Sequence, residues 1–334
     1  MNRKESVSLI ILLLVIAYGA YRYITRNYTA EKSQYLMDTI VKISATSRSK
    51  DVNQKIERVF AYIKALENDL NEYKESGWLW NVNNTDQFKY KMHPDAYQIL
   101  LLADSLYQMT DGRFDITIKP VLDLWQFNSA DPHVPDSVLV RKTLAKVGFN
   151  KIKYDEDYLY KPNGMQLTFG AIAKGYIIDK AREYMLSEDL YKGYIDCHSS
   201  MTFYGNKILP DIVGIQHPRI SNEIIASLQI KDTSIGTSGD YQQFFDVNGT
   251  RYHHILDATS GFPVKNIFSV TVVNPSAMMA DGLSTAIFTI NPELAIECIK
   301  SMPETEVIIY YQSHNTIMSL KSQGIKAIIQ SEKG

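Results

Sequence analysis

Apolar residues recur along this chain with two spacings, one typical of helices and one typical of strands. Residues 51–73 carry an apolar residue every three or four positions, which predicts an amphipathic helix packed on a core. Periodicity and flanking turn residues predict further helices over 94–110, 136–147, 174–187, 276–288 and 292–301. Strands are predicted at 38–44, 151–154, 157–160, 165–169, 193–197, 201–204, 211–215, 224–230, 267–273, 306–311, 316–320 and 325–329, and residues 76–91 are expected to form a loop.

The order of these elements indicates the fold class. Residues 244–255 read as a hairpin with Asn248-Gly249 at its turn, a pair that favours the tight turn between two antiparallel strands. Helices and strands are mixed without a regular βαβ period. We therefore expect an α+β fold with a mixed, mainly antiparallel sheet and packed helices. No internal linker or repeat divides the chain, so residues 29–334 are predicted to form one domain.

The N-terminus has a different composition from the rest of the chain. An apolar run from Val7 to about Tyr21 follows Arg3 and Lys4 and precedes further arginines. Its length suits either a short membrane-spanning helix or the core of a signal peptide. An uncleaved anchor over residues 1–28 is favoured because no small-residue cleavage site stands out, although a cleaved signal stays open. The protein is thus expected to be exported, anchored in the inner membrane and facing the periplasm.

Charge and cysteine content narrow the classes of partner. The formal net charge is -2 and the body of the chain has no long basic run, so nucleic acid is not an expected partner. The two cysteines, Cys197 and Cys298, are too few for a zinc site and are predicted to be free and buried.

The stretch from Tyr252 to Pro263 holds a pair of adjacent histidines. Successive side chains on a strand point to opposite faces, so only one of His253 and His254 can readily face a site. Histidine is well suited to move a proton near neutral pH. His254 is therefore either a catalytic base or an ordinary strand histidine.

Two further motifs offer groups for binding phosphate and metal. The Gly170–Gly175 segment precedes a helix, where small residues and helix N-terminal amides favour phosphate, although a plain strand-to-helix turn has the same composition. Asp281 and Thr285 lie four apart on a predicted helix and so share one face. Their oxygens suit Mg²⁺, but such a pair also occurs on solvated faces and at helix caps.

Aromatic residues follow the turn at Asp111-Gly112, in the run Leu124-Trp125-Gln126-Phe127. A flavin or adenine ring could stack there. A core cluster beneath a loop is an equally good interpretation.

Taken together, these motifs resemble the ApbE-type family of FAD:protein FMN transferases. The resemblance covers roughly residues 35–330. The matching stretches, in the order of the family, are Met37-Asp38-Thr39, 111–127, 170–175, 234–241, 252–263 and 280–285. Six short matches in a fixed order are much more specific than any one of them.

The resemblance implies an activity and a set of site residues. Members of the family split FAD in the presence of Mg²⁺ and transfer FMN to a Thr or Ser hydroxyl of an acceptor flavoprotein, releasing AMP. The implied FAD contacts are Met37, Tyr73, Arg113, Phe114, Asp115, Thr168, Lys174 and Leu256. The implied metal ligands are the carbonyl of Ala171 and the side chains of Asp281 and Thr285, and His254 matches the essential histidine. The implied partner is an envelope redox protein.

Three positions depart from the family pattern. Asp38 stands where a glycine is usual, and Thr168 stands where an Asp is usual. The segment 196–200, Asp-Cys-His-Ser-Ser, replaces a glycine-containing one. Other hypotheses are therefore an FAD-binding protein without transfer, an FAD pyrophosphatase that yields FMN and AMP, and a structural envelope protein.

Overall fold

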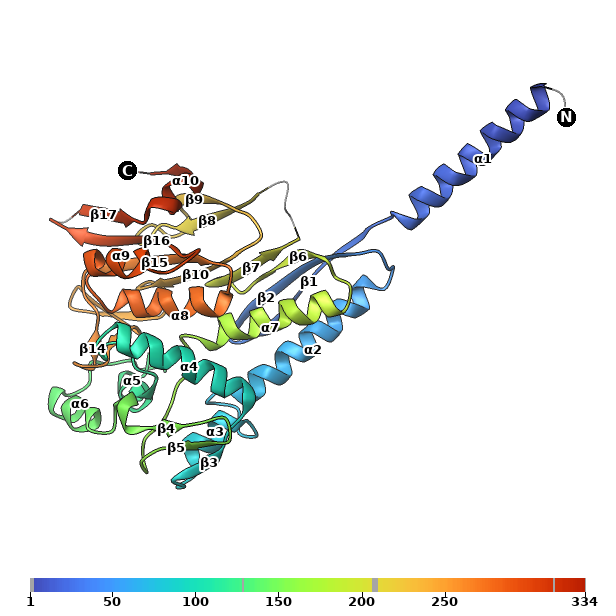
Figure 1. The fold of residues 1–334 in the computed structure, drawn as a ribbon. Helices are drawn as coiled ribbons and strands as arrows, with labels where there is room; N and C mark the ends of the chain where they lie inside the picture. Colours follow the sequence, from blue (N-terminus) through green and yellow to red (C-terminus); the bar gives the residue numbers. More distant parts are fainter. Residues whose placement is uncertain (1–2, 128, 206–209, 315, 334) are drawn as a thin grey trace.

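The computed structural model describes residues 3–127, 129–205, 210–314 and 316–333, and an eight-stranded sheet lies at its centre (Figure 1). Within the described residues all strand pairs are antiparallel, so the expected α+β class is confirmed. In spatial order the strands are β1 Tyr28–Leu36, β2 Thr39–Ser47, β6 Lys192–Asp196, β7 Ser200–Tyr204, β10 Ser234–Gly239, β15 Ile267–Asn274, β16 Glu306–Ser313 and β17 Thr316–Lys321.

Helices cover one face of this sheet. The covering helices are α2 Val52–Leu70, α7 Ala173–Ser187 and α8 Ala277–Phe288, with α4 Pro94–Met109 packed against α8 (Figure 1). The predicted apolar stripe of α2 is the buried one, since Ile56, Val59 and Ile63 have no exposed surface. Burying several such side chains, at about 1.5–3 kcal/mol each, holds the helix on the sheet.

A second, three-stranded sheet covers the opposite face. It consists of β8 Asp211–Gln216, β9 Ile224–Ile230 and β18 Ile329–Glu332, with α10 Gln323–Ile328 beside it. The sequence of β16 is almost continuously apolar because both faces of this strand are covered. Val307 and Ile309 pack on the helix side, whereas Ile308 and Tyr310 pack on the side of the small sheet. The central strands are therefore buried on both faces.

Smaller elements surround one end of the central sheet. They are α3 Trp78–Asn84, α5 Lys119–Trp125, α6 Ser137–Leu144, the 3₁₀ turns Ile116–Ile118 and Phe149–Lys151, the sheet of β3 Lys89–Lys91, β4 Lys153–Tyr154 and β5 Tyr158–Tyr160, and the ribbons β11 Phe244–Val247 with β12 Thr250–His253 and β13 Leu256–Asp257 with β14 Phe262–Pro263. Helix α9 Pro292–Lys300 instead packs beside α8 on β16 and β17. The predicted Asn248-Gly249 turn is confirmed, and both residues have positive φ, as this hairpin turn requires.

Three local predictions are wrong, each for a tertiary reason. Residues 76–91 are not a loop, because the buried Leu79 and Val82 anchor α3 and a short strand follows. Residues 165–169 form no strand, because the side-chain amide of Asn83 pairs with both backbone groups of Leu167 in place of a neighbouring strand. Residues 325–329 are mainly helical, because the Glu306 carboxylate accepts from the backbone N–H of that segment.

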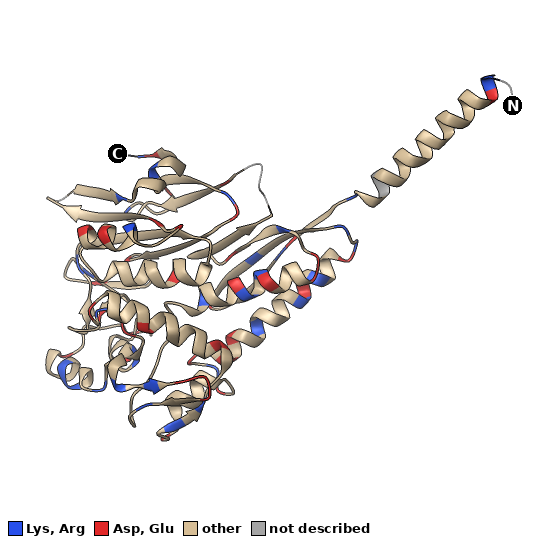
Figure 2. Cartoon of the chain, in the orientation of Figure 1, with Lys and Arg blue, Asp and Glu red and all other residues tan. Residues whose placement is uncertain are grey.

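The apolar N-terminal segment forms α1, Arg3–Ile24, which extends away from the body (Figure 1). It is long and apolar enough to cross a membrane, and its apolar side chains are exposed. Acidic and basic residues are intermixed along the body, whereas α1 carries charge at its first turn (Figure 2). Helix α1 is therefore a candidate membrane or signal segment. The division into an anchor over 1–28 and one domain over 29–334 stays a prediction.

Both cysteines are free, as predicted, but they differ in burial. Cys197 is buried and Cys298 is half-buried, so the prediction of burial is wrong for the second. Burial raises the pKa of the Cys197 thiol, which keeps it protonated.

Candidate functional site

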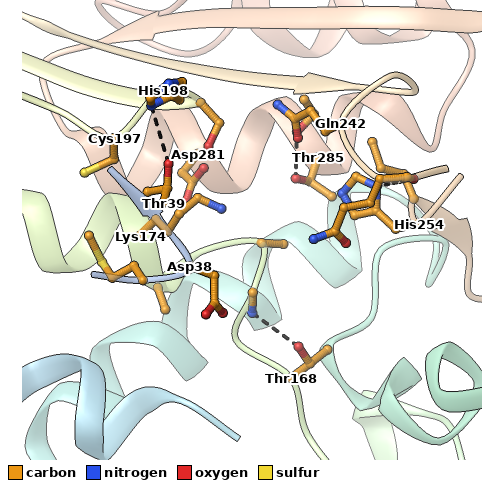
Figure 3. A pocket seen from close by; sticks show the side chains of 18 of the residues that line it. Asp38, Thr39, Thr168, Lys174, Cys197, His198, Gln242, His254, Asp281 and Thr285 are labelled. Carbon is orange, nitrogen blue, oxygen red and sulfur yellow. Dashed lines mark hydrogen bonds between the residues drawn. The ribbon is translucent and has the colours of Figure 1, made fainter. Parts of the chain in front are cut away.

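A cavity of about 1090 Å³ opens where the turns at one end of the central sheet meet the N-terminus of α7 and the middle of α8 (Figure 3). That volume is slightly above the usual range of about 300–1,000 Å³ for small-molecule sites. Eleven of the twelve predicted site residues line it: Met37, Tyr73, Phe114, Asp115, Thr168, Ala171, Lys174, His254, Leu256, Asp281 and Thr285. The fold thus brings together residues from five separate sequence motifs.

The carboxylate of Asp281 is the most buried polar group of this cavity. It is 5% exposed, accepts from the backbone N–H of Gly175 at 2.9 Å, and accepts from the Ser200 hydroxyl at 2.7 Å. Burial raises the pKa of Asp281, and the nearby Lys174 ammonium opposes that shift. Two hydrogen bonds and a cation therefore hold the carboxylate in a fixed orientation at the start of α7.

Asp281 has an oxygen partner one turn further along α8. The Thr285 hydroxyl lines the same cavity and lies 2.9 Å from the Ser238 hydroxyl. Ala171, in the loop that precedes α7, lines the cavity as well. Among the described residues there is no group of three or more His, Cys, Asp or Glu that could hold a metal ion. One carboxylate, one hydroxyl and one carbonyl are hard ligands that suit Mg²⁺, which usually keeps waters and phosphate oxygens as its other ligands.

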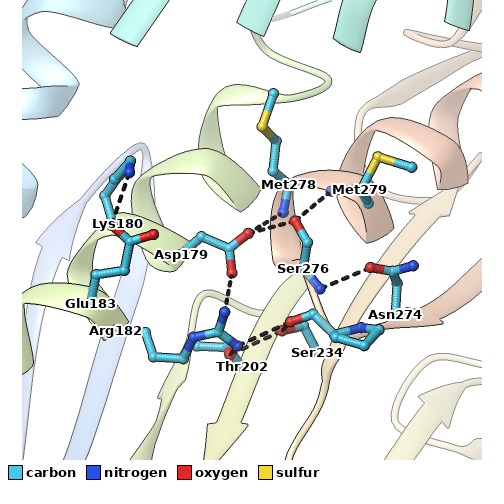
Figure 4. A network of polar contacts seen from close by, with 11 residues as sticks. Asp179, Lys180, Arg182, Glu183, Thr202, Ser234, Asn274, Ser276, Met278 and Met279 are labelled. Carbon is cyan, nitrogen blue, oxygen red and sulfur yellow. Dashed lines mark hydrogen bonds and ion pairs between the residues drawn. The ribbon is translucent and has the colours of Figure 1, made fainter. Parts of the chain in front are cut away.

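A polar network fixes the start of α8 against α7 (Figure 4). The carboxylate of Asp179 accepts from the Ser276 hydroxyl at 2.7 Å and from the backbone N–H of Met278 at 2.9 Å. Arg182 pairs with the other oxygen of Asp179 at 3.3 Å and donates to the carbonyl of Pro275. Because α7 carries Lys174 and α8 carries the oxygen ligands, this network sets the distance between them.

Gly175 allows the two helices to approach closely, and replacing it with alanine is expected to destabilise the protein. An added Cβ would lie 2.3 Å from the carbonyl oxygen of Ala277 and 2.7 Å from the Cβ of Asp281. We expect Gly175→Ala to lower the free energy of unfolding by about 1–3 kcal/mol, measured by urea denaturation. Gly170→Ala is the control, because its new Cβ would meet only the Thr168 hydroxyl at 3.5 Å. Equal stability of the two variants would contradict the close packing.

The two histidines occupy different environments, although β12 ends at His253 and His254 lies in the bend that follows. His254 lines the cavity, and its Nδ1 lies 3.3 Å from the carbonyl of Gln243. His253 is 3% exposed, its Nε2 lies 2.8 Å from the carbonyl of Val264, and its ring packs edge-on against Phe288. His253 thus belongs to the core, and His254 is the histidine that a ligand can reach.

Burial lowers the pKa of His254 from 6.5 to about 4. The imidazole is therefore neutral and able to accept a proton over a wide range of pH. If His254 is the base, kcat/KM will fall only as the pH drops towards about 4, because protonation then removes the acceptor. The pH dependence of kcat/KM for FMN transfer measures this limb, and a limb centred near 6.5 would contradict it.

The altered glycine positions adopt the backbone conformation that glycine would supply. Met37 and Asp38 have φ of 53° and 57° in the two-residue turn that joins β1 to β2. His198 has φ of 64° in the turn between β6 and β7, and its Nδ1 lies 3.4 Å from the Thr39 hydroxyl. The side chains of Asp38, Thr39 and His198 line this end of the cavity (Figure 3). At Asp38 and His198 the chain therefore places larger side chains in the lining of the cavity on a backbone with the positive φ that glycine favours.

The wall near the end of α2 has a carboxylate that sequence reasoning missed. Thr168 donates its hydroxyl to Glu72 at 2.7 Å and accepts from the backbone N–H of Gly170 at 3.2 Å. Glu72 and Tyr73 both line the cavity. The family resemblance expects an Asp at position 168, and here Glu72 supplies a carboxylate next to that position. The sequence offered one signal for Glu72, which is that it directly precedes the predicted FAD contact Tyr73.

Two residues that the family resemblance predicts to contact FAD, Arg113 and Asp115, make other contacts in this structure. The Arg113 side chain pairs with Asp257 and lines a neighbouring cavity of about 470 Å³, so it is not brought to the main cavity. Asp115 lines the main cavity, but its carboxylate accepts from the backbone N–H groups of Thr117 and Phe149 at 2.7 and 2.8 Å. Its role in this structure is to hold the local backbone.

The aromatic run is a core cluster. Trp125 has no exposed surface, and its ring stacks on Phe127 with further contacts to Phe245, Tyr252 and Phe262. Of the run 124–127, Gln126 and Phe127 line the cavity. Of the two interpretations of this run, a ring-stacking surface and a core cluster beneath a loop, the core cluster is therefore the correct one for Trp125.

Comparisons with known proteins agree with this architecture. A model of the ApbE family matches residues 37–309. A protein of Klebsiella pneumoniae (strain 342) named FAD:protein FMN transferase is 29% identical over 269 residues, which is 78% of this chain and 84% of that protein. The crystal structure of the ApbE protein from Thermotoga maritima has a TM-score of 0.83 and 26% identity, and the match covers 92% of this chain and 100% of that one. The flavin transferase ApbE from Vibrio cholerae has a TM-score of 0.81 at 21% identity, covering 91% and 100%.

The antiparallel α+β fold, the cavity at the N-terminus of α7 and the middle of α8, and these relatives define an enzyme of the transferase class. The chain belongs to the ApbE family.

Proposed function

We propose that this enzyme transfers FMN from FAD to a Thr or Ser hydroxyl of an exported redox protein, in a reaction that needs Mg²⁺ and releases AMP. The observation that carries the proposal is one cavity lined by a neutral histidine, a buried carboxylate and a lysine at a helix N-terminus. The named relatives that match most of this chain are FAD:protein FMN transferases, which supports FAD as substrate.

The residues around Asp281 would manage the charge of the reaction. Attack of an alcohol on a pyrophosphate needs neutralisation of negative charge and an in-line approach. A bound Mg²⁺, held by Asp281, Thr285 and the carbonyl of Ala171, would supply a Lewis acid for the phosphate oxygens. Lys174 would bind the same phosphates, because its ammonium adds to the partial positive charge at the N-terminus of α7.

His254 would accept the proton of the attacking hydroxyl. Its imidazole is neutral, and the Gln243 carbonyl beside Nδ1 favours a proton on that nitrogen, which leaves Nε2 as the acceptor. The bond between the hydroxyl oxygen and the FMN phosphorus forms as the bond from that phosphorus to the AMP oxygen breaks. The buried surfaces of Met37, Phe114 and Leu256 would bind the uncharged parts of FAD.

The proposed location follows from α1. We place residues 1–28 in the inner membrane as an anchor and residues 29–334 on its periplasmic side, where the acceptor is an envelope flavoprotein subunit. The apolar, exposed α1 supports a membrane or signal role for this segment.

The test uses the full-length protein in detergent with FAD, Mg²⁺ and a purified envelope redox subunit that carries a Thr in its flavinylation site. We expect the acceptor to gain the mass of one FMN group and an equal amount of AMP to appear. A matched acceptor with Ala in place of that Thr is the control and should stay unmodified.

The same assay separates the competing hypotheses. Free FMN and AMP without acceptor labelling would mean that water is the nucleophile and that the protein is a pyrophosphatase. FAD binding without products would mean a binding protein. Absence of FAD binding would overturn the proposal altogether.

A further inference from the structure

Glu72 is a charged group in the cavity that the proposed reaction does not use. It follows the last turn of α2, is half-buried, and lines the cavity beside Tyr73. The Thr168 hydroxyl donates to one of its oxygens. The carboxylate also accepts from the backbone N–H of Glu72 itself. Since a carboxylate has about four acceptor positions, these two hydrogen bonds leave about half of the acceptor capacity of Glu72 free.

The hydroxyl of Thr168 orients the Glu72 carboxylate through a hydrogen bond. This hydroxyl has one proton, which it donates to Glu72, while its oxygen accepts from the backbone N–H of Gly170. Gly170 belongs to the same loop as Ala171. The Glu72 carboxylate is therefore tied to the loop that reaches the phosphate end of the cavity.

The nearest cation is already paired. Lys119 is buried, contacts both oxygens of Asp123 at 2.5 and 2.7 Å, and lies 4.9 Å from the centre of the Tyr73 ring. It therefore neutralises Asp123. Burial raises the pKa of Glu72, because a carboxylate without a cation of its own is costly to ionise away from water.

The charge of Glu72 decides which part of a substrate it can contact. A carboxylate repels phosphates, which the proposed function places near Lys174 and Asp281. Figure 3 shows that these two residues lie apart from Thr168, the hydrogen-bond partner of Glu72. A carboxylate accepts hydrogen bonds and binds N–H or O–H donors. Beside it, the Tyr73 ring is 65% exposed and offers a surface on which a planar heteroaromatic ring can stack.

We infer that Glu72 is a specificity-determining residue, which accepts a hydrogen bond from an N–H group on the edge of a heteroaromatic ring bound next to Tyr73. The inference rests on the proposed function, because FAD supplies two such rings. Adenine offers its amino group, and the isoalloxazine offers its imide N–H. Either ring presents the same donor chemistry to the carboxylate.

The test measures FAD affinity of the full-length protein in detergent by flavin fluorescence, without Mg²⁺ and without acceptor. Glu72→Ala should weaken binding about 10- to 100-fold, as expected for a hydrogen bond to a charged group. Glu72→Gln keeps an acceptor oxygen and should lose less, about threefold. Glu75→Gln, an exposed residue of the same loop, is the matched control and should bind like the wild type.

Competition with half-molecules identifies the ring. If adenine is the partner, Glu72→Ala loses affinity for ADP and keeps affinity for FMN; if the isoalloxazine is the partner, the pattern is reversed. Equal losses for both halves would indicate a general structural effect and would overturn the inference. Thr168→Val, which removes the hydroxyl that orients Glu72, should reproduce part of the loss for the same half-molecule.

Failure of this inference is distinguishable from failure of the proposed function. Wild-type protein that binds FAD, together with Glu72 variants that bind it equally well, overturns the role of Glu72 and leaves the function intact. Wild-type protein that does not bind FAD overturns both. If Glu72→Ala does not fold, as judged by its melting temperature, Glu72→Gln against Glu75→Gln decides the question in the same assay.

Discussion

His254→Ala will reduce FMN transfer by about 10²- to 10⁴-fold, the usual contribution of a general base. The loss follows from its position, since His254 is the one of the two adjacent histidines that lines the cavity, and burial keeps it neutral. FAD affinity will stay within about twofold of wild type, because a neutral ring that acts on the incoming hydroxyl adds little to ground-state binding. Single-turnover transfer rates and FAD titrations on the same preparation measure both quantities.

His253 provides the matched control for this variant. Its buried ring interacts with the Val264 carbonyl and Phe288, so His253→Gln is expected to lower the melting temperature. The folded fraction of that variant should retain transfer within about tenfold of wild type, because the lost hydrogen bond acts on stability. A larger catalytic loss in His253→Gln than in His254→Ala would reverse the assignment of the two histidines.

The sequence predicted what depends on local pattern. The apolar stripe of α2 and the Asn248-Gly249 turn are encoded by neighbouring residues, and both appear in the structure. His253 and His254 do face different surroundings, but β12 ends at His253, so a bend and not strand alternation separates them. The strand predicted at 165–169 failed because its backbone partner is the side chain of Asn83, a contact across 84 positions that no local pattern encodes.

The site shows the same division. Lys174, Asp281 and Thr285 are helix residues in short motifs, and a family resemblance is enough to single them out. Glu72 was missed because its meaning depends on Thr168, which lies 96 positions further along the chain. In the sequence, Thr168 stands where the family has an Asp, so a carboxylate is expected to be lost. In the structure, the Thr168 hydroxyl donates to the Glu72 carboxylate and orients it.

Replacing the predicted metal ligands on α8, Asp281 and Thr285, is expected to reduce FMN transfer strongly as well. Asp281→Asn will reduce transfer at least about 100-fold, since even indirect partners of a bound metal are worth about 10- to 100-fold in affinity. Thr285→Val will raise the Mg²⁺ concentration needed for half-maximal rate by about tenfold. Titration of the transfer rate with Mg²⁺ measures both. Ser284→Ala, which removes a neighbouring buried hydroxyl of the same helix, is the control for effects on packing.

The sign of the Asp281→Asn effect on FAD binding separates a metal ligand from a structural residue. Without Mg²⁺ the carboxylate repels the pyrophosphate, so the variant should bind FAD at least as tightly as wild type. With Mg²⁺ present, wild type should bind more tightly than the variant, because only the carboxylate recruits the cation. The asparagine can keep the hydrogen bond from Gly175 through its oxygen and donate its amide to Ser200, so the fold tolerates the change. Weaker binding in both conditions would show that Asp281 supports the cavity and does not hold a metal.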